Sequence, residues 1–268
     1  IQRNPSHCPQ GKLSRVWLAS KILFDGTRAT GIRYEQHGKV HEVRAHREVV
    51  LTAGALQSPQ LLQVSGVGPA KLLNQLGIPV VADRAGVGEN LQDHLQIRLT
   101  YEVARPITTN DLLHSWTGRA KMGLQWALFR DGPLAVGINQ GGMFCRALPD
   151  EAKTPDIQFH FSTLSADTAG GDVHAFPGCT YSVCQLRPES RGNVRIRTGT
   201  MRDAPSIQPN YLATDLDRRT TVAGVRFARR VAATEPMASL MKREVRPGRD
   251  AQSDDELLHF CREYGQTI

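Results

Sequence analysis

Residues 49–68 read Val49-Val50-Leu51-Thr52-Ala53-Gly54-Ala55-Leu56-Gln57-Ser58-Pro59-Gln60-Leu61-Leu62-Gln63-Val64-Ser65-Gly66-Val67-Gly68. The apolar run 49–51 predicts a strand covered on both faces, as in an α/β sheet. Gly54 then allows a close backbone approach where that strand ends. Ser58 can cap a helix through its hydroxyl, and Pro59 suits the first helical position. These residues predict a strand, a glycine turn, a short helix and a second glycine turn.

The regions on either side add antiparallel elements to this α/β unit. Before it, residues alternate in strand fashion over 16–24, 29–36 and 40–47, and Asp-Gly and His-Gly turns separate them, which predicts a meander of hairpins. After it, we expect strands at 157–161, 181–187 and 193–197 and two amphipathic helices, the second opened by the capping box Ser253-Asp254-Asp255-Glu256. Trp116 and Met122, on an earlier helix, are expected in the core. The predicted fold class is therefore α/β and α+β.

Composition narrows the classes of protein to consider. The chain has 268 residues, of which 40% are hydrophobic, so it can bury a sizeable core. Its formal net charge is +7, but the basic residues are scattered and no recognised nucleic-acid module is present, so we expect no nucleic-acid partner. No apolar run approaches the roughly 20 residues that cross a bilayer, which predicts no transmembrane segment. A soluble protein is expected.

Cysteine usage indicates a reducing compartment. The five cysteines form no CxxC pair and are odd in number, so they suggest neither a zinc site nor a complete disulfide framework. Buried thiols of this kind fit a cytoplasmic protein. No metal ligands and no catalytic cysteine are assigned.

Residues 54–68 resemble the second signature of the glucose-methanol-choline (GMC) flavin oxidoreductases. A further string, Gly86-Val87-Gly88-Glu89-Asn90-Leu91-Gln92-Asp93-His94, is similar to the point where this family crosses from its FAD-binding domain into its substrate domain. Similar segments follow at 155–161, 186–192 and 209–212. The resemblance implies part of a Rossmann-like FAD-binding domain over 1–94. It also implies a substrate-binding domain with a largely antiparallel sheet and flanking helices over 95–248, and a return toward the FAD-binding domain over 249–268.

Two features of the family are not found in this sequence. A dinucleotide domain needs a glycine-rich turn between its first strand and first helix, and the chain contains no GxGxxG. In the family, residues like 264–268 lead into a histidine-proline segment that carries the catalytic histidine. We therefore expect the chain to be an incomplete portion that is inactive alone, and no residue in it is assigned as the catalytic base.

The resemblance implies two groups of cofactor-contacting residues. Thr52, Ala53 and Gly54 are expected beside the adenosine half of FAD, although a plain strand-to-helix turn would also explain them. Ala19 lies where the family places a valine whose backbone meets the adenine. Two more residues belong to the crossing segment, where they contact the flavin or only fix the domain junction: Asn90 and His94.

Two residues are assigned to the substrate pocket. His160 matches a family position that hydrogen-bonds the alcohol oxygen, whereas residue chemistry alone would make a histidine between phenylalanines a core group. Gln140 occupies a position where choline-acting relatives carry a glutamate. Because neutral glutamine cannot attract a quaternary ammonium as a carboxylate does, choline is not the expected substrate.

The implied activity is oxidation of an uncharged primary alcohol to the aldehyde. A hydride passes from the α-carbon to the flavin N5, and a histidine beyond residue 268 takes the hydroxyl proton. The electron acceptor (oxygen, a quinone or another compound) stays open, as does the choice between oxidase and dehydrogenase. The alternatives are a hydroxynitrile lyase of the same fold and a non-catalytic remnant.

Overall fold

The computed structural model describes residues 17–168 and 171–268, which divide into two compact units. The first contains the described part of Ile1–Gln92 together with Arg191–Asn210, and the second contains Asp93–Ser190 and Tyr211–Ile268. Contacts within the chain define these units. They do not test the functional boundaries expected at residues 94 and 248, which stay predictions.

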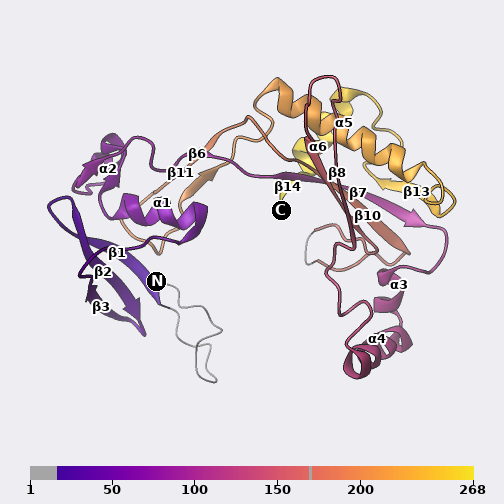
Figure 1. The fold of residues 1–268 in the computed structure, drawn as a ribbon, viewed down its shortest axis with the longest axis horizontal. Coiled ribbons are helices and arrows are strands. Elements are labelled where there is room, and N and C mark those ends of the chain that lie inside the picture. Colours follow the sequence, from indigo (N-terminus) through magenta and orange to yellow (C-terminus); the bar gives the residue numbers. More distant parts are fainter. Residues whose placement is uncertain (1–16, 169–170) are drawn as a thin grey trace. The chain divides into compact units, whose positions relative to one another are not determined.

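The described part of the first unit contains three small sheets and two helices (Figure 1). Its elements are β1 (Leu18–Asp25), β2 (Arg28–Gln36), β3 (Lys39–Arg44), α1 (Gly54–Val64), β4 (Val67–Gly68), α2 (Ala70–Gln75), β5 (Ala82–Asp83), β6 (Glu89–Leu91), β11 (Gly192–Arg195) and β12 (Ser206–Gln208). The first three strands form the expected antiparallel meander, which is confirmed. β4 and β5 pair in parallel, and β11 lies between β12 and β6.

The strand predicted at 49–51 is wrong. This segment belongs to no strand, and Val50 is 65% exposed. A strand exists only where a neighbour accepts and donates its backbone hydrogen bonds. Among the residues that the structure describes, none pairs with 49–51, so its apolar character alone does not produce a sheet.

Helix α1 begins earlier than predicted, at Gly54. This glycine has a φ of 83°, in the left-handed region that glycine adopts without strain. Ser58 does not cap the helix from outside; its Oγ lies in the first turns and accepts a hydrogen bond from the Ala53 backbone N–H at 3.1 Å. Pro59 lies inside the helix and not at its first position.

The second unit is built on one antiparallel sheet with strand order β13-β7-β10-β9-β8, and β14 pairs with the other end of β7. Its elements are β7 (Leu95–Val103), α3 (Thr109–His114), α4 (Trp116–Phe129), β8 (Gly141–Cys145), β9 (Ile157–Ser162), β10 (Gly178–Gln185), α5 (Asp215–Ala232), β13 (Met241–Arg246), α6 (Asp254–Tyr264) and β14 (Gln266–Thr267). The predicted strands at 157–161 and 181–187 and the capping box of α6 are confirmed.

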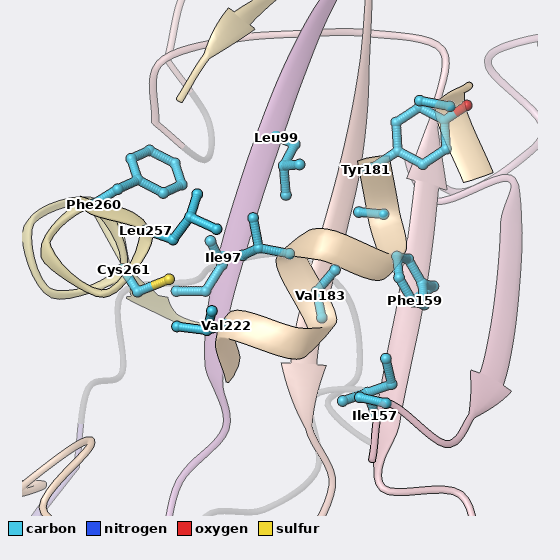
Figure 2. Packing of buried hydrophobic residues seen from close by; sticks show 14 of the residues in the cluster. Ile97, Leu99, Ile157, Phe159, Tyr181, Val183, Val222, Leu257, Phe260 and Cys261 are labelled. Carbon is cyan, nitrogen blue, oxygen red and sulfur yellow. The ribbon is translucent and has the colours of Figure 1, made fainter. Parts of the chain in front are cut away.

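The two faces of this sheet differ in chemistry. On one face, side chains from alternate positions of β7, β9 and β10 pack under α5 and α6, and Figure 2 shows Leu257 and Val222 of these helices near Ile97, with Val183 under α5. The positions between them point to the opposite face, as the period of two in a strand requires. That second face carries polar side chains, so it is the place to look for a site.

Helix α4 exposes much apolar surface. Met122 is buried as expected, but the same expectation for Trp116 is wrong, because this side chain is 81% exposed. Leu124 and Leu128 are also exposed, while Gly118 packs closely against the backbone of Leu112 at the end of α3. None of the described helices is long and apolar enough to span a membrane.

Candidate functional site

The polar face of the six-stranded sheet brings four residues into one row. Register pairs Arg98 of β7 with Ser182 of β10, Ser182 with His160 of β9, and His160 with Gly142 of β8. Gly142 carries no side chain, and Ser182 is small and buried, so the imidazole and the guanidinium are the large groups of this row. His160 therefore lies on the polar face and away from the core that α5 and α6 cover.

Among the residues that the structure describes, the ring of His160 is hydrogen-bonded at one nitrogen. Its Nδ1 lies 3.2 Å from Nε2 of Gln96, which sits on β7 and reaches diagonally across β10. Gln96 in turn accepts a hydrogen bond at Oε1 from Nε of Arg98 at 2.9 Å. Burial lowers the pKa of His160 from its usual value, and the neighbouring His94 lowers it further. The imidazole is therefore neutral at neutral pH.

His94 is the second residue of the second unit and lies directly before β7. Its Nε2 lies 3.3 Å from the backbone carbonyl of Leu186, and its ring contributes to the lowered pKa of His160. Its assigned role beside the cofactor stays a prediction. Asn90 belongs to β6 of the first unit, where it is exposed and has a φ of 60°.

Gln140 lies directly before β8, two residues before Gly142, the partner of His160. Its backbone N–H donates to the carbonyl of Phe161 at 2.8 Å, and its Oε1 accepts from Oγ1 of Thr163 at 3.1 Å. The side chain is exposed and uncharged. Its assigned role in the substrate pocket stays a prediction, and its position beside the His160 row is compatible with it.

The remaining predicted cofactor residues lie in the first unit. Ala19 is a half-buried residue of β1, opposite Tyr34 of β2. Thr52, Ala53 and Gly54 are all exposed at the beginning of α1. No side chain caps this helix end and its first turn contains no acidic residue, so its N–H groups can face an oxygen-rich ligand. Their assignment to an FAD site stays a prediction.

Sequence reasoning missed three residues of this region. Gln96 and Arg98 belong to no motif, and only the period of β7 places them on the face of His160. The third is Tyr211, whose hydroxyl donates to the carboxylate of Asp93. Burial, and then Asp93, raises the pKa of Tyr211 to about 12. Asp93 and Tyr211 each lie in a segment that resembles the family, 86–94 and 209–212. This shared resemblance was the one signal in the sequence that could have identified Tyr211.

Two models of one known protein family match this chain, one toward each end. The N-terminal GMC oxidoreductase model matches residues 9–96, and the C-terminal GMC oxidoreductase model matches residues 188–268. The chain therefore belongs to the GMC oxidoreductase family. The resemblance and the mixed α/β fold class are confirmed, and so is the cofactor of this family, FAD.

Two curated relatives are oxygen-dependent choline dehydrogenases. The protein from Pectobacterium carotovorum is 39% identical over 250 residues, which are 93% of this chain and 44% of the relative. The protein from Pseudomonas fluorescens SBW25 is 40% identical over 253 residues, again 93% and 44%. The chain thus spans less than half the length of these relatives.

Solved structures agree on the fold. A formate oxidase matches with a TM-score of 0.86 and 23% identity, over 94% of this chain and 49% of that one. Pyridoxine 4-oxidase from Mesorbium loti matches with a TM-score of 0.76 and 25% identity, over 94% of this chain and 45% of that one.

Proposed function

We propose that the protein oxidises an uncharged primary alcohol to the aldehyde with FAD, and that this chain supplies the substrate-facing sheet. The observation that carries the proposal is the environment of His160. Its Nδ1 is engaged by Gln96, while Nε2 has no hydrogen-bond partner among residues 17–168 and 171–268. A neutral imidazole with one free nitrogen on a polar face is suited to hold an alcohol oxygen.

In this reaction the α-carbon of the alcohol loses a hydride and its hydroxyl loses a proton, which leaves the aldehyde. Bound FAD supplies the hydride acceptor. His160 orients the oxygen, and Gln140 lines the substrate side. Backbone groups of Ala19, Thr52, Ala53 and Gly54 would hold the cofactor, and His94 would contact the flavin or only fix the domain junction. The proton goes to a histidine that the family resemblance places beyond residue 268.

The charges near His160 favour an uncharged alcohol. Arg98 is the ionised side chain of its row, and it is positive. Glu102, on the same face of β7, is already paired with Lys242 at 2.7 Å and with Arg243 at 2.6 Å. Among the described residues no carboxylate contacts His160, so nothing there attracts a quaternary ammonium.

Choline is the second candidate substrate, because the curated relatives are named choline dehydrogenases. Choline and 3,3-dimethyl-1-butanol have the same shape and differ in charge. We expect kcat/KM for the neutral alcohol to equal or exceed that for choline. A kcat/KM for choline higher by tenfold or more would overturn the assignment of an uncharged substrate.

The absorbance spectrum of the product of the whole gene, from 300 to 550 nm, tests the reaction class. Flavin bands that bleach on anaerobic addition of a primary alcohol support the oxidoreductase. Bands that persist across an alcohol panel contradict it and favour the lyase, and a protein without flavin bands favours the remnant. Reoxidation by air or by a quinone then identifies the electron acceptor.

We also place the protein in the cytoplasm. Cys145, Cys179, Cys184 and Cys261 are free thiols, while Cys8 lies outside the described residues. Burial raises the pKa of Cys179 to about 12, so this thiol is unreactive. Cell fractionation with an antibody against the protein tests the location, and recovery in a periplasmic or extracellular fraction would contradict it.

A further inference from the structure

Arg98, Gln96 and His160 are joined by two successive hydrogen bonds, which we call the relay. The chemistry of Arg98 fixes which atom donates in each bond. An arginine side chain carries five N–H donors and no acceptor. Its Nε lies 2.9 Å from Oε1 of Gln96, so that atom must be the amide oxygen and must accept. The amide nitrogen of Gln96 therefore points at Nδ1 of His160, 3.2 Å away, and donates to it.

An accepting Nδ1 settles which nitrogen of His160 carries the proton. A neutral imidazole has one N–H and one lone pair, so a lone pair at Nδ1 leaves the proton on Nε2. A doubly protonated imidazolium would set an N–H against the NH₂ of Gln96. The contact therefore disfavours the cation as well as the other neutral tautomer.

Packing holds this arrangement in place. Gln96 is 3% exposed, and it reaches His160 across β10, where the intervening side chains Ser182 and Cys184 are small and buried. Arg98 lies two residues along β7 from Gln96 and so on the same face. Each member of the relay comes from a strand interior, which positions side chains more rigidly than a loop does.

We infer that Arg98 and Gln96 are positioning residues that fix His160 as a hydrogen-bond donor through Nε2 toward the substrate oxygen. This inference rests on the proposed function and sharpens it. His160 does not abstract the hydroxyl proton; it stabilises the negative charge that develops on the alcohol oxygen as that proton leaves. The base must then be another group.

Long-range ¹H–¹⁵N spectra of the imidazole nitrogens test the tautomer directly. In the 268-residue chain, at a pH where His160 is neutral, we expect a protonated Nε2 and an unprotonated Nδ1. Gln96→Glu replaces the donor with an acceptor, so the proton should move to Nδ1. Gln158→Glu is the matched control, because it adds the same charge on the same face of β9, at a residue that makes no hydrogen bond to Nδ1 in the described structure. It should leave the tautomer unchanged.

Several results would overturn the inference. They are a protonated Nδ1 in the unmodified chain, no change in Gln96→Glu, or an equal change in the control. If Gln96→Glu does not fold, Arg98→Met serves instead, because it frees the amide to rotate and should give both tautomers. These readouts need neither flavin nor alcohol, so they stand apart from the test of the proposed reaction. In the flavin-loaded protein, Gln96→Glu should lower kcat roughly a hundredfold, the usual cost of one lost oxyanion donor, with a smaller change in KM.

Discussion

The two units of the chain are stabilised in different ways. The second unit has a continuous apolar core, in which side chains of β7, β9 and β10 pack under α5 and α6. The apolar cluster of the first unit is small and consists of Val64, Leu73, Ile78 and Ile196. There a polar residue, Gln63, is completely buried and links three segments. The difference teaches that the stability of a region with little apolar core can depend on a few buried polar groups whose hydrogen bonds are all formed.

The hydrogen bonds of Gln63 show how the first unit depends on buried polar contacts. Its Nε2 donates to the carbonyls of Val194 at 2.9 Å and Val87 at 3.3 Å, and its Oε1 accepts from the N–H of Ile196 at 3.0 Å. Gly88 leaves room for it, since a Cβ there would lie 2.4 Å from the Gln63 amide. One side chain thus joins α1, the turn before β6 and the strand β11.

The largest effect is expected from Leu99→Ala in the second unit. Leu99 is fully buried, and removing three of its carbons leaves a cavity that costs about 3 kcal/mol. Hydrogen exchange followed by mass spectrometry should show faster exchange in β7 and β10, with β11 of the first unit unchanged. Equal acceleration in β11 would contradict the view that each unit has its own source of stability.

Gln63→Leu should be next, at about 2 kcal/mol. Leucine keeps the volume but leaves two carbonyls and one N–H buried without partners. We expect faster exchange in α1, β6 and β11. Gln57→Leu is the control, because this residue lies on the same helix and is exposed. A variant at position 63 as stable as the control would show that the apolar cluster suffices.

The fold could be predicted wherever a pattern is local. Alternation and Asp-Gly or His-Gly turns identified β1, β2 and β3, and the capping box identified the beginning of α6. The prediction of a strand at 49–51 was wrong because a strand depends on a pairing partner and not only on its own residues. The helix positions predicted for Ser58 and Pro59 were wrong because the helix begins one turn earlier, at Gly54.

The candidate site shows the same limit. The family resemblance assigned His160, but the sequence contains no sign that Gln96 holds its ring. Gln96 and Arg98 were not found, because the relay depends on the register of β7, β10 and β9. Register is set by the whole sheet, so residues that meet across a strand cannot be paired from spacing alone.

Substitution of Asp217 tests whether a buried carboxylate also contributes to the stability of the second unit. Burial alone would raise its pKa, but hydrogen bonds from Ser190, Glu189 and Gln185 outweigh burial and lower it. A lowered carboxyl pKa contributes stability above the ordinary value of about 4, and this is lost as pH falls through the folded-state pKa. Asp217→Asn should cost about 1.5 kcal/mol at neutral pH, because one accepting oxygen is lost.

Urea unfolding between pH 7 and pH 3 measures this contribution of Asp217. The unmodified chain should lose stability on acidification, while Asp217→Asn should lose less, so the two curves converge. Glu102 and Glu151 also have lowered pKa values, so some acid sensitivity remains in the variant. Parallel curves would show that Asp217 is not the titrating group.

The smallest effect is expected from Arg33→Gln, at about 0.5 kcal/mol. Arg33 and Glu42 pair across β2 and β3 with Nη2 2.8 Å from Oε1, but their side chains are 43% and 38% exposed, so water screens the attraction. Lys39→Gln on β3 is the control, since it removes the same charge without an ion pair in the described structure. Urea midpoints of both variants should agree closely at 0.5 M salt. A loss above about 1.5 kcal/mol for Arg33→Gln alone would mean that this meander, with so little apolar core, relies on its surface charges as it does on Gln63.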